Sequence, residues 1–417
     1  MIMRKTLPKK GRGWRDLEKS MGHMRKGDMD WRNGRHSFHV WYGGDGLFEI
    51  QKRAYAMFMQ ENGGGVGRTF MSLKIMEDEV IDFGAGLLHA PKAVGHITSG
   101  GSESIFVALK AARDWARVKR PGARRPEVVI PYSGHPTFNR AADYLGLTIK
   151  RVAVGADYRA DAAAMEKAIT RNTIALVGSA VCFPFGVVDP IRDLGQVAKR
   201  HGLWLHVDAC VGGYSAPFVK KLGYPVPDFD FAVPGVCSMS ADLHKYGFCA
   251  KGTSSVFYRN QSLAKYQPFD FKDWPQGRFE CPNVASTRPG GSISAAWAVM
   301  NHLGEDGYLK LNKRLMRMRQ RYINGIKAID GLYIRGEPEL LIVSYGSDEF
   351  DMGAVADEMQ RRKWFVGSQV NPRGIMIGLS LPHEAVVGEY LDDLSRSVTK
   401  AKKAGKGKRR RAVRSTY

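Results

Sequence analysis

Cysteine is scarce in this chain of 417 residues, and the five that occur are scattered: Cys182, Cys210, Cys237, Cys249 and Cys281. An odd number without a C-x-x-C pair argues against a disulfide framework and against a zinc site. No run of 18 apolar residues occurs, so the sequence predicts no membrane-spanning helix. Residues 1–35 lack the apolar core of a secretory signal. Together these absences predict a reduced, cytoplasmic protein without a metal site.

Acidic residues are missing from the C-terminal end. The formal charge of +22 is concentrated at the two ends, because residues 1–35 carry +7, residues 395–417 carry +10 and the middle only about +5. The basic end is typical of a solvated, disordered tail. It predicts at most a weak electrostatic contact with anionic lipid or nucleic acid. No aromatic-interleaved motif for reading nucleic acid accompanies it.

Apolar strands alternate with helices through the middle of the chain. We expect strands at 127–131, 148–154, 173–179 and 203–208, with helices between them, and a further strand at 252–258. This pattern predicts an α/β fold with a mainly parallel sheet flanked by helices, whose ligands bind beyond the carboxyl ends of the strands. The predicted division is an N-terminal arm (1–60), a large domain (61–305), a smaller C-terminal α/β domain (306–398) and a basic tail (399–417).

One lysine, Lys245, lies directly after His244 among small and apolar neighbours. Burial there would lower the pKa of its amine, and a neutral amine is the form that attacks a carbonyl. The alternative is an ordinary lysine at a strand end. Asp208 ends an apolar strand, where it is either a buried functional carboxylate or a turn-forming aspartate.

Two glycine-rich turns, at 97–104 and 287–292, precede helices. Such turns offer backbone N–H groups to a phosphate, although an ordinary helix start has the same composition. His135 follows a strand and is either a ring that stacks on a cofactor or a turn histidine. An amine, a carboxylate and phosphate-binding turns on one sheet fit pyridoxal 5'-phosphate, which needs a partner for its aldehyde, its ring nitrogen and its phosphate.

Longer motifs carry a resemblance to a known family. They are Thr98–Ile105, His206–Gly213, Ser238–Gly247, Lys251–Gly252 and Ser286–Gly291. The chain resembles the group II decarboxylase-like branch of fold-type I pyridoxal-phosphate enzymes, and within it the sphingosine-1-phosphate lyase family. The similarity runs from about residue 70 to 310 and continues more weakly beyond.

The resemblance implies a role for each matching residue. On the cofactor side Lys245 would bond the aldehyde, Asp208 would pair with the ring nitrogen and His135 would stack on the ring. The phosphate cradle would contain Gly101, Ser102 and His244, closed by Gly290 and Gly291 of a neighbouring subunit in a homodimer. On the substrate side Lys251 would hold a phosphate, and Tyr42 lies near a substrate-contacting position. Lys245, Lys251 or Tyr246 would relay protons.

Two positions on the substrate side depart from the lyase pattern. A histidine is missing from the segment Asn62–Arg68, so Asn62 or Arg68 would have to substitute for it. Phe185 stands where the lyases tend to have a second histidine. Neither departure touches the cofactor side.

The resemblance implies retro-aldol cleavage of the C2–C3 bond of a phosphorylated sphingoid base to a fatty aldehyde and phosphoethanolamine. The runner-up is a pyridoxal-phosphate-dependent amino-acid decarboxylase, because Lys251 would also bind a carboxylate. A third hypothesis is a basic nucleic-acid- or membrane-binding protein on an inactive scaffold, against which the intact pair of Lys245 and Asp208 argues.

Overall fold

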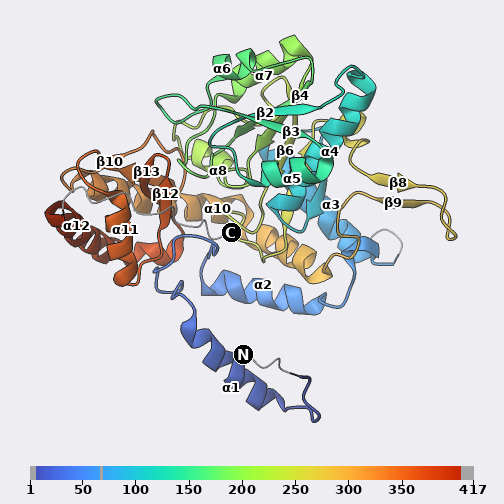
Figure 1. Cartoon of the computed structure of the whole chain (residues 1–417). Helices are drawn as coiled ribbons and strands as arrows, with labels where there is room; N and C mark the ends of the chain where they lie inside the picture. Colours follow the sequence, from blue (N-terminus) through green and yellow to red (C-terminus); the bar gives the residue numbers. More distant parts are fainter. Residues whose placement is uncertain (1–5, 66–68, 405–417) are drawn as a thin grey trace.

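The computed structural model describes residues 6–65 and 69–404. Figure 1 shows a large sheet covered by helices, a smaller C-terminal layer beside it, and helix α1 (Trp14–Met24) standing away from the body. The predicted fold class, a mainly parallel sheet flanked by helices with a smaller C-terminal α/β unit, is confirmed. In the described part of the chain, no helix is both long and apolar enough to cross a bilayer.

The large sheet has seven strands in the order β1-β7-β6-β5-β4-β2-β3. Their bounds are Val94–Thr98 (β1), Glu127–Pro131 (β2), Thr148–Val152 (β3), Thr173–Ser179 (β4), Trp204–Asp208 (β5), Val236–Ala241 (β6) and Ser254–Tyr258 (β7). Strands β3, β2, β4, β5 and β6 run parallel, and β7 is antiparallel to both of its neighbours. The carboxyl ends of β1, β2, β4, β5 and β6 therefore meet at one edge of the sheet, where ligands of such folds bind.

Helices of the large domain cover this sheet. They are α4 (Gly101–Lys119), α5 (Thr137–Leu145), α6 (Ala162–Lys167), α7 (Ile191–His201), α8 (Ala216–Lys221) and α9 (Gln261–Ala264). Helix α7 illustrates why they form, because Ile191, Leu194 and Val197 recur at helical spacing and all three are buried. It ends at Gly202, whose left-handed backbone (φ 59°) lets its N–H group bond back to the last turn.

Three further helices join the arm to the body: α2 (Asp45–Met57), α3 (Met71–Leu87) and α10 (Gly290–Lys327). The start of α10 packs closely on α2, because a Cβ atom on Gly291 would come within 2.6 Å of the Tyr55 carbonyl oxygen. The sequence predicts two helices here, at 293–303 and about 308–329, and the structure agrees, because α10 consists of two helical stretches separated by the non-helical backbone of Gly304 (φ 55°). This bend lies beside the predicted boundary at residue 305, and the division into domains stays a prediction.

The smaller sheet is antiparallel, in the order β10-β11-β13-β12. Its strands are Tyr333–Ile334 (β10), Ile342–Gly346 (β11), Gly367–Val370 (β12) and Arg373–Gly378 (β13), and its helices are α11 (Met352–Arg361) and α12 (Val387–Ala404). Because α12 continues to Ala404, residues 399–404 belong to a helix and not to the predicted tail. The remainder of that predicted tail, 405–417, lies outside the described residues.

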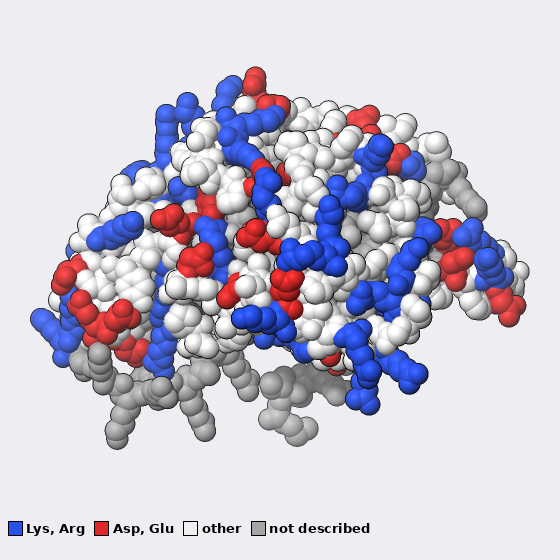
Figure 2. All heavy atoms as spheres, turned by 90° about the horizontal axis from the view of Figure 1, so that it is seen from above, with Lys and Arg blue, Asp and Glu red and all other residues white. Residues whose placement is uncertain are grey.

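Basic and acidic side chains are mixed on the face of the molecule that Figure 2 shows. Ion pairs occur in the described part of the chain, including Arg200 with Glu166 and Arg192 with Asp228. This mixture agrees with the small net charge of the middle of the sequence.

Candidate active site

A cavity of about 360 Å³ lies where the carboxyl ends of the parallel strands meet. Six residues predicted to hold a cofactor line it together: Lys245, Asp208, His135, Gly101, Ser102 and His244. Lys251, predicted to hold substrate, lines it as well. These residues come from segments up to 150 positions apart, so the sheet brings together what the motifs predicted separately.

Asp208 is the last residue of β5 and is buried. Its Oδ1 atom accepts a hydrogen bond from the backbone N–H of Cys210 at 3.1 Å and another from the Ser240 hydroxyl at 3.2 Å. These two hydrogen bonds hold the carboxyl group of Asp208 in place at the floor of the cavity.

Lys245 follows the end of β6 after a short turn, with its Nζ atom 3.0 Å from Oδ2 of Asp242. Burial by itself would lower the pKa of this amine, but the negative charges of the neighbouring carboxylates, Asp242 first and then Asp208, outweigh burial and raise it. The expectation that burial alone would leave a neutral amine is therefore wrong. In the protein without cofactor, Lys245 is an ammonium paired with a carboxylate.

Asp242 is the functional residue that sequence reasoning missed. Burial opposes its charge, but the neighbouring Lys245 lowers its pKa on balance. Its Oδ1 atom is buried without a hydrogen-bond partner in the described structure. Asp242 lies three residues before Lys245, and one turn brings two such side chains onto the same side of the chain. This spacing could have identified Asp242 from the sequence.

The predicted phosphate cradle lies at the first turn of α4, and its role stays a prediction. Gly100 precedes the helix and provides no side-chain cap, so the first N–H groups of the helix are available to an anion. Glu103 fixes this turn, because its carboxylate accepts from the N–H groups of Ser99 at 2.7 Å and Val284 at 2.7 Å. His244 lines the same cavity, with its Nδ1 atom 2.6 Å from the carbonyl oxygen of Thr253.

Close packing beneath this turn explains the glycine at its start. A Cβ atom on Gly101 would come within 2.7 Å of Asp242 Oδ1 and 2.8 Å of Cys210 Sγ. Distances under about 3 Å are sterically forbidden for such atoms, so a larger residue would displace the cradle or the carboxylate. The cradle and the partner of Lys245 are thus in direct contact.

His135 forms one wall of the cavity. Its Nδ1 atom accepts from the N–H group of Thr137 at 3.2 Å and lies 2.9 Å from the Thr137 hydroxyl. The edge of its ring meets Phe183, with the ring centroids 6.0 Å apart. These contacts fix the ring beside the cavity, and its stacking on a cofactor stays a prediction.

Lys251 and Trp41 lie on the substrate side. The Lys251 Nζ atom is 4.6 Å from the centroid of the Trp41 ring, a cation–π distance. Part of the Lys251 side chain remains exposed, but burial of the amine within the cavity, followed by the charge of Lys245, lowers its pKa to about 8. Lys251 is thus mostly a cation at neutral pH.

The predicted site residues Tyr42 and Tyr246 do not line this cavity. The hydroxyl of Tyr42 bonds to Arg32 and Asp45, and the neighbouring Trp41 lines the cavity in its place. The hydroxyl of Tyr246 donates to the carbonyl oxygen of Leu379 at 2.9 Å within the buried core. Neither tyrosine lines the cavity of this chain, and the roles predicted for Tyr42 and Tyr246 stay predictions.

The proposed substitutes for the missing histidine also differ from expectation. Asn62 accepts from the N–H groups of Gly64 at 2.7 Å and Arg288 at 3.1 Å, and it does not line the cavity. Arg68 lies outside the described residues. Phe185 is buried against Tyr158, with ring centroids 4.7 Å apart, and Phe183 lines the cavity in its place.

Gly290 and Gly291 are buried against their own chain. A Cβ atom on Gly290 would come within 2.8 Å of the Glu61 carbonyl oxygen. They do not line the cavity of the chain that carries them. Their contribution to a neighbouring subunit stays a prediction.

The arrangement fits pyridoxal 5'-phosphate. One cavity offers an amine at Lys245, an anion at Asp208 and a helix start without a side-chain cap at Gly101, matching the aldehyde, the ring nitrogen and the phosphate of that cofactor. Gly101 packs tightly against Asp242, so a side chain at position 101 would displace the turn that is predicted to bind the phosphate.

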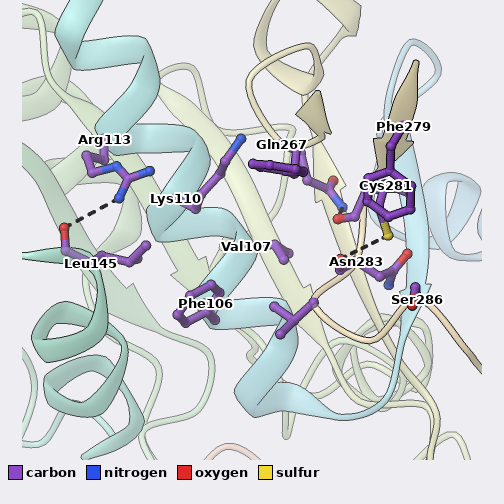
Figure 3. A pocket seen from close by; sticks show the side chains of 13 residues that line it. Phe106, Val107, Lys110, Arg113, Leu145, Gln267, Phe279, Cys281, Asn283 and Ser286 are labelled. Carbon is purple, nitrogen blue, oxygen red and sulfur yellow. Dashed lines mark hydrogen bonds between the residues drawn. The ribbon is translucent and has the colours of Figure 1, made fainter. Parts of the chain in front are cut away.

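A second cavity, of about 390 Å³, lies between α4 and the end of the hairpin of β8 (Phe269–Phe271) and β9 (Phe279–Cys281). Figure 3 shows Arg113 bonding to the carbonyl oxygen of Leu145, and Cys281 bonding to Asn283. Lys110 donates to two carbonyl oxygens, those of Tyr266 and Pro268. The polar groups here hold the backbone in place, and no lining residue is shared with the first cavity.

Comparison with known proteins points to the same chemistry. Residues 71–346 match the pyridoxal-dependent decarboxylase conserved domain. The chain is 40% identical to a sphingosine-1-phosphate lyase of Arabidopsis thaliana, over 95% of this chain and 74% of that protein. A solved sphingosine-1-phosphate lyase of Burkholderia pseudomallei has a TM-score of 0.92 at 33% identity, over 96% of this chain and 94% of that one. A probable L-tyrosine/L-aspartate decarboxylase of Methanothermobacter thermautotrophicus is 33% identical, over 84% of this chain and 93% of that protein.

Proposed function

The chain belongs to the pyridoxal-dependent decarboxylase family and, within it, to the sphingosine-1-phosphate lyases, and from this premise we propose that it cleaves the C2–C3 bond of a phosphorylated sphingoid base. The products are a fatty aldehyde and phosphoethanolamine. The observation that carries the proposal is a single cavity in which Lys245 and Asp208 face Lys251 and Trp41. The first pair serves a cofactor, and the second adds a cation for a phosphorylated substrate.

Pyridoxal 5'-phosphate, when bound, supplies an aldehyde that condenses with amines and an electron-poor ring that accepts the electron pair of the broken bond. Lys245 would hold the aldehyde and Asp208 the protonated ring nitrogen. Gly101, Ser102 and His244 would bind the phosphate of the cofactor. Trp41 and Lys251 close the substrate side of the cavity, where Lys251 binds an anion.

The cleavage is redox-neutral and requires two proton movements. The C3 hydroxyl loses its proton and its oxygen becomes the aldehyde oxygen, while C2 gains a proton. Lys245 is released without a proton when the substrate amine replaces it, and because Asp242 raises its pKa it is then a strong base for the hydroxyl proton. Asp242, 3.0 Å away, stabilises the ammonium so formed, which then holds the proton for C2. The Tyr246 hydroxyl donates a hydrogen bond to the carbonyl oxygen of Leu379 in the buried core, so the proposal assigns no proton transfer to it.

Product analysis tests this function. Purified protein with bound cofactor is mixed with a phosphorylated sphingoid base and, separately, with tyrosine, aspartate and glutamate. We expect a fatty aldehyde and phosphoethanolamine from the first mixture and no carbon dioxide from the others. Carbon dioxide release from an amino acid, without aldehyde from the sphingoid base, would establish the decarboxylase alternative in its place.

The assembly and setting of the protein are further parts of the proposal. A homodimer would let Gly290 and Gly291 of one subunit close the cradle of the other, and light scattering after size-exclusion chromatography would detect it. All five cysteines are free in the structure, which supports a reduced, cytoplasmic setting. The basic C-terminal end would contact anionic lipid or nucleic acid only weakly and in a salt-sensitive manner.

A further inference from the structure

We propose that His39 binds the phosphate of the substrate, beside Lys251 on the wall of the active-site cavity. The sequence motifs gave this residue no role, and the structure places it in the cavity together with Trp41 and Lys251. The inference rests on the proposed function, which supplies a phosphorylated substrate. It makes His39 a binding and specificity residue, not a catalytic one.

The backbone holds the His39 ring in this position. Its φ angle is +67°, in the left-handed region that non-glycine residues seldom adopt and that is costly to maintain. The preceding residues are anchored on both sides, because the N–H group of Ser37 donates to Phe365 and the carbonyl of Ser37 accepts from Gly378. Phe38 is buried against Phe183, with ring centroids 5.6 Å apart. The unusual backbone of His39 is therefore imposed by a firmly packed arm.

His36 orients the ring of His39. The Nδ1 atom of His39 lies 3.2 Å from Nε2 of His36. Burial, together with the charges of His39 and His383, lowers the pKa of His36 to about 4, so His36 is neutral at physiological pH. A neutral His36 can accept a hydrogen bond from His39, which then keeps a protonated ring in one orientation.

An anion bound between His39 and Lys251 would stabilise the positively charged forms of both side chains. Burial and the nearby charge of Lys251 lower the pKa of His39, because the Lys251 ammonium repels a proton on the His39 ring. A phosphate, with up to two negative charges, removes this repulsion and accepts hydrogen bonds from both side chains. Phe365 packs near the His39 ring at 6.1 Å and adds no charge. The positive charge of Lys251 and the uncharged ring of Phe365 near His39 therefore favour a negatively charged ligand.

This site is separate from the cradle for the cofactor phosphate. The cradle belongs to the start of α4, at Gly101 and Ser102, whereas His39 and Trp41 belong to the N-terminal arm. A cofactor in the cradle therefore leaves His39 and Lys251 to the substrate. The ligand of His39 is accordingly the phosphate monoester of an amine whose nitrogen reaches Lys245.

Binding measurements on the protein with bound cofactor test the proposal without turnover. The probes are phosphoethanolamine and, as its unphosphorylated counterpart, ethanolamine, measured by calorimetry at pH 6.5. His39→Asn tolerates the left-handed backbone, and His39→Gly relieves the strain should the asparagine variant fold poorly. His302→Asn, on an exposed histidine of α10, is the matched control.

We expect either His39 variant to raise the Kd for phosphoethanolamine roughly tenfold, the loss of one charge-assisted hydrogen bond, with ethanolamine unaffected. In turnover, KM for the phosphorylated base should rise similarly while kcat stays within about threefold. An unchanged Kd, an equal loss for ethanolamine, or no phosphoethanolamine binding by the unaltered protein would each overturn the proposal. If the unaltered protein binds phosphoethanolamine but yields no aldehyde, the lyase function fails while the role of His39 in phosphate binding stands.

Discussion

The Nζ atom of Lys245 lies 3.0 Å from Oδ2 of Asp242, and both side chains are largely buried. This ion pair connects the amine that bonds the cofactor to the floor of the phosphate cradle, because Asp242 also lies against Gly101. The pair determines the charge of Lys245 before the cofactor arrives and after the substrate displaces the lysine. Its removal should therefore change the pH dependence of both events.

Asp242→Asn should increase the rate at which the apoprotein takes up cofactor near pH 8. The carboxylate raises the pKa of Lys245 above its ordinary value of 10.5, so fewer neutral amines exist at pH 8 in the unaltered protein. The amide lacks that charge, and we expect an acceleration of roughly tenfold that disappears as the pH rises well above 10.5. Stopped-flow absorbance of cofactor association across pH measures it. Identical pH profiles for both proteins would show that Asp242 does not control the amine.

Binding of the substrate phosphate should weaken above pH 8. The pKa of Lys251 is lowered to about 8, so the ammonium is present below that pH and is lost above it. KM for the phosphorylated base should rise as the pH passes from 7 to 9. Lys251→Arg keeps its charge over this range, so its KM should stay flat. A rise of the same size in the arginine variant would assign the pH dependence to another group.

Gly101→Ala should impair cofactor retention, whereas Gly100→Ala should not. The added methyl group at position 101 would lie 2.7 Å from Asp242 Oδ1, but at position 100 its nearest neighbour would be His244 at 3.9 Å. The backbone of Gly100 is extended (φ 162°) and accepts alanine. We expect at least tenfold weaker cofactor binding for the first variant, measured by equilibrium dialysis. Equal retention in both would remove the steric argument for the cradle.

Arg288→Met should strongly destabilise the fold. Arg288 donates to both carboxylate oxygens of Glu77, at 2.7 and 2.9 Å, and to the carbonyl oxygens of Ile97 and Gly63. Removing one partner leaves a buried, uncompensated charge, which costs about 3–5 kcal/mol. Urea unfolding should also show that the double variant Glu77→Leu/Arg288→Met is more stable than Arg288→Met alone. A single variant within about 0.5 kcal/mol of the unaltered protein would contradict this account.

Much of the site was predictable because its chemistry is tied to local sequence. Lys245 and Asp208 are recognisable from a small-residue setting and a strand end, and the structure places both in one cavity. The substrate side was less predictable, because residues 40–44 have no regular secondary structure from which the direction of a side chain could be read. The residue that lines the cavity is Trp41, one position before the predicted Tyr42. Tyr246 lies in a turn next to Lys245, and its hydroxyl donates to Leu379 in the core.

Two strands of the large sheet escaped sequence reasoning because polar residues interrupt them. In β6, Ser238 and Ser240 are buried, and Ser238 accepts a hydrogen bond from the indole N–H of Trp204 at 2.8 Å. In β1, the N–H group of Ile97 donates to Glu77 at 3.0 Å. Long-range partners make these polar groups tolerable inside the sheet. Such partners belong to the tertiary structure, and the local pattern of apolar residues carries no sign of them.

The identity of the lysine that holds the cofactor is the most direct test of the whole account. The protein with bound cofactor is reduced with borohydride, which makes an amine–aldehyde bond permanent, and is then digested and mapped by mass spectrometry. We predict the mass of reduced cofactor on Lys245, its loss in Lys245→Ala, and unchanged labelling in Lys251→Arg. Label on Lys251 or another lysine, or persistent label in Lys245→Ala, would contradict the assignment of the active site.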